Sequence, residues 1–304
     1  MLDLRRLRLL RELDARGTLT AVADALSYSP SSVSQQLSEL EREAGVPLLE
    51  RAGRGVRLTD AGHVLVEHAG ALLARMEQAE ADLAASAGAV VGTVRVASFQ
   101  TGAVNLLPAA LATVAAAHPA LRVEVVQAET GSALRSLALG QVDLVVGIEY
   151  DHVPEARGPT IERERLLVER MLLALPPDHP RARPGRRVRL AGLAGAPWGA
   201  GAVGGHAALV VRACNLLGGF QPDVRHQSDD LLVLRALVAA GHALTFLPEL
   251  LAARGDGAVV LRRIAEADLQ REVFLAARRD ALGRPALAVV RDAVAGAARG
   301  LAAR

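Results

Sequence analysis

The chain has 304 residues, of which 51% are hydrophobic and only 2% aromatic, and its formal net charge is +2. This length allows two or three domains, whose cores have to be built from alanine, leucine and valine. The single Cys214 excludes an internal disulfide and a cysteine metal cluster, and no apolar run approaches the length of a membrane span. We expect a cytoplasmic protein without signal peptide, metal or cofactor, in which Cys214 is a buried thiol.

Two short helices separated by a turn are predicted near the N-terminus. Apolar residues recur at helical spacing over residues 19–26, and the pattern then breaks. Ser29 followed by Pro30 is typical of an N-cap with proline at the first helical position. The second helix is expected over residues 30–44. Its core-facing stripe is Val33, Leu37 and Leu40.

The opposite face of this second helix is polar but uncharged. It carries Ser31, Ser32, Ser34, Gln35 and Ser38. Such a face can approach base edges without burying a charge, and a glutamine amide can pair with adenine through two hydrogen bonds. We predict that these five side chains read bases in the major groove of DNA. The alternative is a solvated, serine-rich helix.

A basic β-hairpin is predicted between residues 48 and 59. Apolar Leu49, Val56 and Leu58 alternate with Arg51, Arg54 and Arg57, and Gly53 and Gly55 lie at the tip. The three arginines are expected to contact DNA phosphates, which fix register without reading sequence. The alternative is that they only keep the hairpin soluble. Residues 1–60 contain nine arginines and nine acidic residues, so this segment is not basic overall. Positive charge for DNA binding has to be clustered, in the hairpin and in Arg5, Arg6, Arg8 and Arg11.

A long helix is predicted after the hairpin, from about residue 58 to 87. Its apolar residues are spaced alternately by four and three, as in a coiled-coil seam. The seam consists of Leu65, Ala69, Leu72, Met76, Ala79 and Leu83. Since such a stripe needs a partner surface, we predict that it pairs with a second copy to form a homodimer. The alternative is a helix that lies on its own domain.

Strands and helices alternate in the remaining sequence. Strands are predicted at 94–97, 121–126 and 142–148, with helices at 106–117 and 133–139 between them. This βαβαβ order predicts a mostly parallel sheet covered on both faces. A second set comprises strands 168–175, 243–247 and 259–261 with helices 207–217, 231–240 and 249–253. Strand 272–277 and helix 285–301 are expected to return to the first set, which leaves two α/β lobes and a cleft between them.

These patterns divide the chain into four parts, one of which consists of two separate segments. We assign residues 1–58 to a winged helix-turn-helix and 59–88 to a linker and dimerisation helix. The first regulatory subdomain is expected to combine 89–162 with 267–304, and the second to comprise 163–266. The predicted fold class is therefore α/β, with an N-terminal winged helix-turn-helix.

The N-terminal sixty residues resemble the LysR-type transcriptional regulators. The matching motifs are Thr20–Ala23, Ser29–Leu40, Glu41, Gly45, Pro47–Arg51 and Gly55–Gly62. The motifs are specific only in combination. This resemblance implies a C-terminal half similar to periplasmic solute-binding proteins, with two Rossmann-like subdomains that hold a small effector. It also implies that the polar loop 98–102 contacts that effector.

Ligands of open α/β sheets bind at the carboxyl ends of strands, often against helix N-termini. Backbone N–H groups at such a loop favour an anion, so we predict that the effector carries a carboxylate. The candidate effector-binding residues are Ser98, Gln100, Thr101, Glu129, Trp198, His206, Gln227 and Thr245. Trp198 precedes a glycine-rich loop that either closes on a ligand or is a plain connection.

No catalytic motif is present: the sequence lacks HExxH, GxSxG and a P-loop. We therefore expect a DNA-binding transcriptional regulator rather than an enzyme, acting as a dimer of dimers on double-stranded DNA. Two alternatives stay open. One is a metabolite-binding protein or enzyme that uses the helix-turn-helix only for assembly, and the other is a nonspecific architectural DNA binder.

Overall fold

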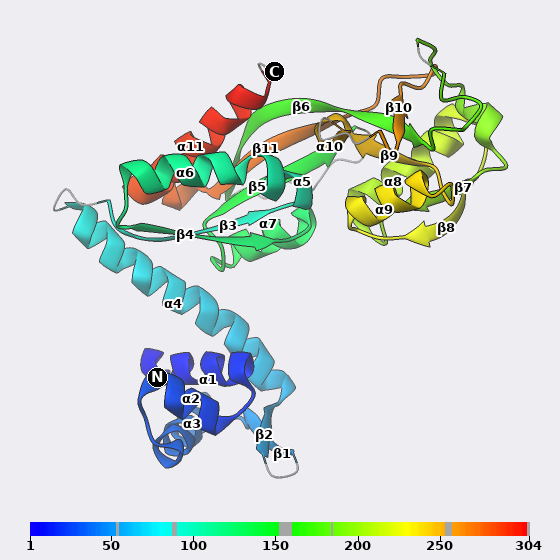
Figure 1. Ribbon diagram of the computed structural model, residues 1–304. Helices are drawn as coiled ribbons and strands as arrows, with labels where there is room; N and C mark the ends of the chain where they lie inside the picture. The colour runs from blue at the N-terminus through cyan, green and yellow to red at the C-terminus, as the bar shows by residue number, and fades with distance from the viewer. Residues whose placement is uncertain (53–54, 87–89, 152–159, 184, 253–256, 303–304) are drawn as a thin grey trace. The chain divides into compact units, whose positions relative to one another are not determined.

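The computed structural model describes residues 1–52, 55–86, 90–151, 160–183, 185–252 and 257–302 (Figure 1). The chain divides into two units. The first comprises Met1–Thr93 with the short segment Ala138–Gln141, and the second comprises Val94–Leu137 and Val142–Arg304. Each unit has a hydrophobic core of its own. The boundary expected at residue 88 lies outside the described residues.

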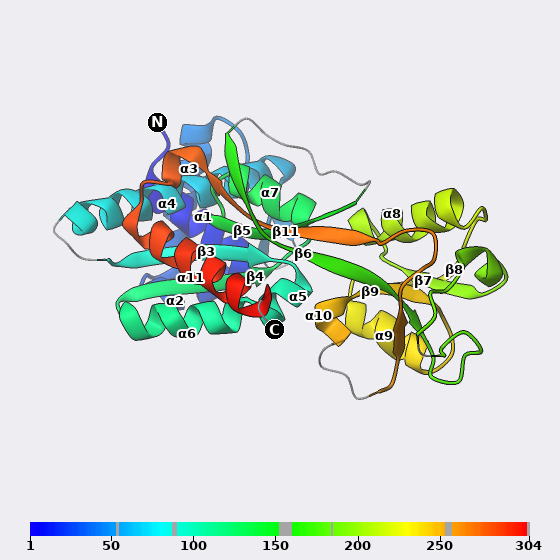
Figure 2. The same ribbon diagram turned by 90° about the horizontal axis from the view of Figure 1, so that it is seen from above.

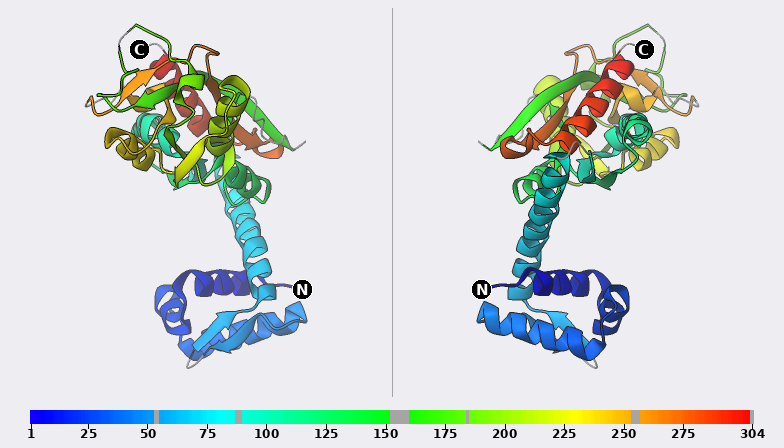
Figure 3. Two further views of the ribbon diagram at one scale, coloured as in Figure 1. Left: turned by 90° about the vertical axis from the view of Figure 1, so that its right-hand side faces the viewer. Right: turned by 90° about the vertical axis from the view of Figure 1, so that its left-hand side faces the viewer.

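The first unit contains the predicted helix-turn-helix, hairpin and long helix. Its elements are α1 (Leu4–Arg16), α2 (Leu19–Leu26), α3 (Pro30–Ala44), β1 (Leu49–Ala52), β2 (Gly55–Leu58) and α4 (Asp60–Ser86). Figure 3 shows α1, α2 and α3 gathered around the start of α4, with the β1–β2 hairpin beside them. The predictions for residues 19–26 and 30–44 are confirmed.

Local capping explains where these helices begin and end. Asp3 accepts from the backbone N–H groups of Arg5 and Arg6, and Thr18 accepts from that of Ala21. The Ser29 hydroxyl accepts from the Ser32 N–H at 3.1 Å, so the predicted cap before Pro30 is confirmed. These side chains replace partners that the first turn of a helix lacks. 

Only the first part of the α4 apolar stripe packs within its own unit. Ala69 is fully buried and Leu65 packs against the same core. Farther along, Leu72 and Met76 are each 48% exposed and Leu83 is 71% exposed. The alternative of a helix lying on its own domain therefore applies to the beginning of α4, and the rest of the stripe faces away from that core.

The second unit is built on one continuous sheet of order β10-β6-β11-β5-β3-β4, with β9 also paired to β6. These strands are β3 (Gly92–Ser98), β4 (Leu121–Gln127), β5 (Leu144–Tyr150), β6 (Ile161–Leu175), β9 (Thr245–Pro248), β10 (Val260–Arg262) and β11 (Gln270–Arg278). A separate parallel pair joins β7 (Pro197–Ala200) to β8 (Asp223–Gln227). β6 pairs with β11 along its first part and with β9 and β10 near its end, so it runs from one lobe into the other.

The parallel pairing predicted for the first set of strands is confirmed for β3 and β5, whereas the strands from the rest of the chain join the same sheet in antiparallel orientation. β3 and β5 are parallel, but β11 is antiparallel to both β5 and β6, and β6 is antiparallel to β9 and β10. The cause is the returning strand, which inserts between β5 and β6 and so meets both from the opposite direction. The first part of β6 and the β7–β8 pair were missed, because charged residues alternate along residues 162–165 and β7 is only four residues long.

Helices cover both lobes. The first lobe carries α5 (Gln100–Asn105), α6 (Leu107–Ala117), α7 (Thr130–Ala138) and α11 (Pro285–Ala302), and the second carries α8 (Gly204–Arg212), α9 (Leu231–Ala239) and α10 (Glu249–Ala252). In Figures 1 and 2, α6 and α11 lie side by side on one face of the first lobe's sheet and α7 covers the other. The predicted helix 207–217 changes at Ala213 into a π-helical turn.

Candidate nucleic-acid interface and ligand cavity

The outer face of α3 is open, as the sequence predicts. Ser31, Ser34, Gln35 and Ser38 are exposed and Ser32 is half-buried, whereas the inward Val33, Leu37 and Leu40 are buried. Ser31 shares a 3.0 Å hydrogen bond with the Ser29 hydroxyl. Within the described part of the chain, the side chains of Ser34, Gln35 and Ser38 have no hydrogen-bond partner. Their donors and acceptors are therefore available to an external ligand.

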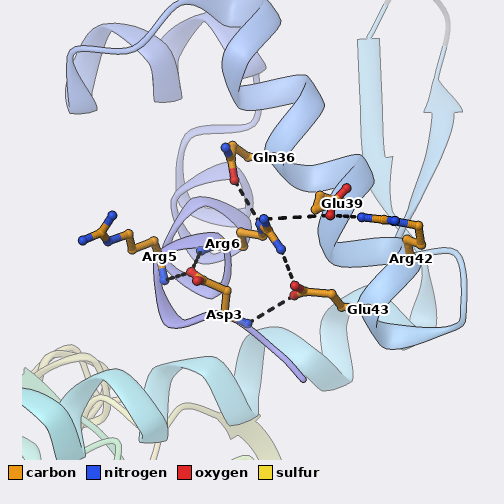
Figure 4. Close-up of polar contacts among 7 residues, drawn as sticks. All are labelled: Asp3, Arg5, Arg6, Gln36, Glu39, Arg42 and Glu43. Atoms are coloured by element: carbon orange, nitrogen blue, oxygen red, sulfur yellow. Dashed lines mark hydrogen bonds and ion pairs between the residues drawn. The ribbon is translucent and has the colours of Figure 1, made fainter.

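A polar clamp fixes the other side of α3 to the start of α1 (Figure 4). The Arg6 guanidinium donates from Nε to Gln36 at 3.0 Å, pairs with Glu43, and lies 4.0 Å from Glu39. Arg6 is therefore held by acceptors on α3, which removes one charge from the basic cluster predicted with Arg5, Arg8 and Arg11. The clamp orients α3 without using its outer face.

The hairpin is tied to α3 through Glu41, whose Oε1 accepts from the N–H groups of Leu48 and Leu49 at 2.9 and 3.0 Å. Of the three predicted phosphate-binding arginines, Arg51 is exposed on β1. Arg57 is exposed on β2 but forms an ion pair with Glu50 across the hairpin, at 2.6 Å. Arg54 lies outside the described residues. This pair engages Arg57 Nε, one of the nitrogens that carry the five N–H donors of the guanidinium.

Gly62, at the start of α4, is required by close packing. A Cβ at this position would lie 2.3 Å from the Leu48 carbonyl oxygen, a distance that no side chain tolerates. The Thr59 hydroxyl caps α4 by accepting from the Gly62 N–H at 3.1 Å and donates to the Pro47 carbonyl at 2.9 Å. These contacts connect the hairpin to the first turn of α4.

In the second unit, a cavity opens between the two lobes. Its inner chamber is small, with a volume of about 30 Å³. It is lined by Phe99, Gln100, Thr101, Glu129, Ile148, Tyr150, Val203, His206, Ser228, Asp229, Leu231 and Arg271. An adjoining outer chamber of about 470 Å³ shares Glu129, Ile148, Tyr150 and Val203 with it. Four predicted effector-binding residues meet here, namely Gln100, Thr101, Glu129 and His206.

Arg271, on β11, is the central charge of the inner chamber and is only 1% exposed. Its Nε and Nη2 donate to Glu169 Oε2 at 2.8 and 2.7 Å, and Nη2 also donates to the Thr101 hydroxyl at 2.7 Å. Burial lowers the pKa of Arg271, but the Glu169 carboxylate and Tyr150 outweigh this effect and raise it above its ordinary value. Arg271 Nη1 is buried and has no hydrogen-bond partner among the described residues.

Two other buried groups stand beside Arg271. Burial raises the pKa of the Tyr150 hydroxyl, against the opposing effect of Arg271. Burial also lowers the pKa of His206. The Gly201 N–H donates to His206 Nδ1 at 3.0 Å, so Nε2 carries the proton and donates to the Phe246 carbonyl at 2.8 Å. His206 is therefore neutral in the folded chain, and both of its nitrogens are occupied.

Gln100 connects the two lobes directly. Its Nε2 donates to Asp230 at 2.6 Å, and its Oε1 accepts from the Leu231 N–H at the start of α9 at 3.0 Å. The Gln100 amide holds the pKa of Asp230 below its ordinary value. Because both partners lie in the second lobe, any motion that separates the lobes has to break this pair of hydrogen bonds.

Four predicted effector-binding residues are not brought to the cavity lining. Ser98 is buried and donates to the Phe99 carbonyl at 3.1 Å, and Thr245 donates to the Gly199 carbonyl at 2.8 Å. Trp198 is fully buried against Phe246, with ring centroids 5.9 Å apart. Gln227 is exposed at the end of β8. Trp198 thus belongs to the core of the second lobe rather than to a closing loop.

Sequence reasoning missed Arg271, Tyr150 and Asp229. Arg271 precedes the apolar run Val273–Ala277, so its position at the start of a buried strand was the available signal. Tyr150 ends an apolar strand that was expected to stop at residue 148.

Cys214 is buried, and burial raises its pKa to about 12, so the prediction of a buried thiol is confirmed.

The described residues include neither a membrane-spanning helix nor a cluster of metal ligands. None of their helices has the length and apolar character needed to cross a membrane. Nor do three or more of their histidine, cysteine, aspartate and glutamate side chains converge as metal ligands do.

Known proteins resemble both units. The sequence profile described as "Bacterial regulatory helix-turn-helix protein, lysR family" matches residues 4–63, and "LysR substrate binding domain" matches residues 87–299. The chain is 34% identical over 143 residues to the HTH-type transcriptional regulator PcaQ of Agrobacterium fabrum, covering 47% of this chain and 46% of PcaQ. It is 30% identical over 179 residues to the HTH-type transcriptional regulator BenM of Acinetobacter baylyi, covering 59% and 57%.

The chain thus spans about half the length of the curated relatives it matches. Among solved structures, CbnR, a LysR family transcriptional regulator, is similar over 98% of this chain and 99% of its own, with a TM-score of 0.73 and 24% identity. That likeness concerns the fold. Because the two profile matches cover most of the sequence, the chain belongs to the LysR family of helix-turn-helix regulatory proteins.

Proposed function

We propose that the chain is a sequence-specific, DNA-binding transcriptional regulator whose action is controlled by a small effector in the cavity. The observation that carries this proposal is the outer face of α3, which is exposed and uncharged while the other face is clamped to α1. Further support comes from the HTH-type transcriptional regulators that the chain resembles and from a similar structure of CbnR complexed with its target DNA.

In this proposal, α3 enters the major groove. Ser31, Ser32, Ser34, Gln35 and Ser38 contact base edges, and Gln35 is the residue suited to adenine. Arg51, Arg54 and Arg57 hold the phosphates beside the groove. An uncharged reading face costs little desolvation when it is pressed against bases, and the arginines supply the electrostatic attraction that the face lacks.

The effector occupies the cavity, where it contacts Gln100, Thr101, Glu129 and His206, and a carboxylate on it accepts from Arg271 Nη1. Ser98, Trp198 and Thr245 are buried and would support the lining from behind, whereas Gln227 is exposed at the end of β8. An effector changes the lobe arrangement only if it binds the two arrangements with different affinities. Gln100 is the contact most directly affected, because its partners Asp230 and Leu231 lie in the other lobe.

A homodimer brings two α3 helices to adjacent half-sites. We propose that the exposed stripe Leu72, Met76, Ala79 and Leu83 of α4 pairs with the same stripe of a second copy, continuing from the covered Leu65 and Ala69. Two such dimers would form a homotetramer. With DNA as its partner, the protein would act in the cytoplasm, as a regulator rather than an enzyme.

The proposal is tested by letting the purified protein select sheared fragments of its source genome at moderate salt, followed by sequencing. We expect enrichment of a few intergenic sites that share an interrupted palindrome. Flat recovery, repeated with cell metabolites added, would contradict it. A cavity-dependent ligand or turnover phenotype that survived deletion of residues 1–58, together with flat recovery, would instead support an enzyme or metabolite-binding protein.

A further inference from the structure

An arginine-rich loop, residues 176–189, follows β6 in the second lobe, and residues 260–268 run beside it. Together the two segments contain seven arginines and three acidic residues, whereas the whole chain has a formal net charge of only +2. Figures 1 and 2 show them beside β10, at the end of the second lobe where β6 terminates. Positive charge is therefore concentrated at this end of the lobe.

The loop is fixed to the neighbouring segment by backbone bonds and by one arginine. The Val188 N–H donates to the Arg263 carbonyl at 2.9 Å. The Arg262 guanidinium donates to the carbonyl groups of Ala182 and Arg183. Because the backbone is held in this way, arginines on the loop lose less conformational freedom when they bind a ligand.

Two arginines of this region serve the fold, and the others are open to solvent. Arg187 pairs with Asp268 at 3.0 Å, and Arg262 is occupied by the loop carbonyls. Arg183, Arg186 and Arg189 are exposed, and within the described chain their side chains form neither a hydrogen bond nor an ion pair. We use the name arginine tip for the exposed set Arg181, Arg183, Arg186, Arg189 and Arg263.

The surroundings of the arginine tip favour a polyanion over a protein surface. None of the large hydrophobic side chains exposed on the described residues lies in 176–189 or 260–268. Protein interfaces, by contrast, are centred on buried aromatic and aliphatic side chains. Guanidinium groups bind phosphates through paired hydrogen bonds. The phosphates repeated along a DNA duplex can therefore engage several of these arginines at once.

We infer that the arginine tip is a second DNA-binding surface, which contacts the phosphate backbone of a duplex separately from α3. It adds affinity without reading sequence, because phosphate contacts carry no base information. This inference goes beyond the proposed function, which assigns DNA contacts to the first unit alone. It rests on that proposal only for the identity of the polyanion.

The test uses the full-length protein and a random-sequence duplex of about 150 bp, one persistence length of DNA. Affinity is measured over a range of salt concentrations for wild type and for the double variant Arg183→Gln/Arg186→Gln. Each phosphate contact contributes about 0.9 to the slope of log affinity against log salt. The slope of the double variant should therefore be shallower by about two, and its binding roughly 10- to 100-fold weaker at about 0.1 M salt.

The double variant Arg165→Gln/Arg299→Gln is the matched control. Both residues are exposed and lie outside the arginine tip, and among the described residues neither side chain has an ion pair or hydrogen bond. The control removes the same charge from the chain, so it measures the general effect of a lower net charge on DNA binding. It should keep the slope of the wild type.

A second measurement locates the contact in the wild-type protein. Phenylglyoxal modifies accessible arginines, and mass spectrometry of the digested protein reports each modified position. The same random-sequence duplex should protect Arg183 and Arg186 from modification and leave Arg165 and Arg299 as reactive as in the free protein. This readout does not depend on the folding of a variant.

Three results overturn the inference. These are equal salt slopes for wild type and Arg183→Gln/Arg186→Gln, an equal change in the control variant, and modification of the arginine tip that DNA does not reduce. The last result would point to an acidic protein as the partner. Flat selection of genome fragments with a tip-dependent slope would remove the proposed sequence-specific regulation and leave the arginine tip standing. Intact selection with a tip-independent slope would remove the arginine tip alone.

Discussion

The outer face of α3 and the Arg271 network are both polar, but they are constructed in opposite ways. The α3 face comes from one helix, is exposed, and leaves Ser34, Gln35 and Ser38 without hydrogen-bond partners in the described chain. Arg271 is buried and meets partners 102 and 170 residues away in sequence, Glu169 and Thr101. Substitutions on the face should therefore change intermolecular properties alone, whereas substitutions in the network should change folding as well.

The largest effect is expected for Arg271→Met. It leaves the Glu169 carboxylate, 2% exposed, buried without its cation. Breaking a buried pair in this way costs about 3–5 kcal/mol of unfolding free energy. Denaturant unfolding measures the loss, and adding Glu169→Gln to the same chain should recover a large part of it. A loss below about 1 kcal/mol would contradict this account, because it would mean that the Arg271–Glu169 pair contributes no more than an exposed ion pair does.

Met76→Glu tests the exposed stripe of α4. Met76 is 48% exposed in the single chain, so this change should leave unfolding of the monomer nearly unaltered. If the exposed half of Met76 is buried between two copies, each side chain contributes to association roughly half of the 1.5–3 kcal/mol of a fully buried one, about 0.7–1.5 kcal/mol. Sedimentation over a range of concentrations should then show a weaker dimer. Unchanged sedimentation would exclude this stripe from the dimer interface.

Arg51→Ala separates phosphate contact from base reading. Arg51 is exposed on the hairpin, and its loss should weaken binding to all DNA sequences alike. The slope of log affinity against log salt should become shallower by about one for each phosphate contact removed. Arg57→Ala is the informative companion, since Arg57 is paired with Glu50 in the free protein. Equal slopes for wild type and Arg51→Ala would remove the hairpin from the interface.

The smallest effect is a pH dependence due to His206. Burial lowers its pKa in the folded chain, so the unfolded chain takes up a proton first as the pH falls. The stability that neutral His206 contributes is present above its ordinary pKa and is lost below it, by about 1 kcal/mol at one pH unit lower. Denaturant unfolding of wild type and His206→Gln, measured at the ordinary pKa of histidine and one pH unit below it, gives the contribution of His206 to the pH dependence of the unfolding free energy. Identical pH dependence in the two proteins would contradict the assignment.

The difference between the two regions also explains what could be predicted from sequence. Helix spacing, the Ser29 cap and the outward Gln35 are local properties, and the structure places all of them where the pattern does. The polar stretch at 98–102 was correctly expected to contribute to the cavity, through Gln100 and Thr101. Periodicity was sufficient wherever a single element determines which way a side chain points.

The network could not be predicted in the same way. Whether Arg271 faces a cavity depends on β11 inserting between β5 and β6, a pairing that no local spacing specifies. The same limitation applies to Trp198, whose position beside glycines favoured a loop, although its ring packs in the core against Phe246. Arg6 was counted in a basic cluster, because its α3 partners Gln36 and Glu43 lie at least thirty residues away and no local spacing reveals them.

The most direct test of base reading uses two adjacent glutamines. Gln35 is exposed on the outer face of α3, whereas Gln36 accepts from Arg6 within the clamp. We would measure the affinities of wild type, Gln35→Ala and Gln36→Ala for a selected site and a scrambled site at the same salt. Gln35→Ala should reduce the preference for the selected site by about 1–3 kcal/mol, whereas Gln36→Ala should preserve it. A preference unchanged by Gln35→Ala, or lost equally in both variants, would contradict the assignment of the reading face.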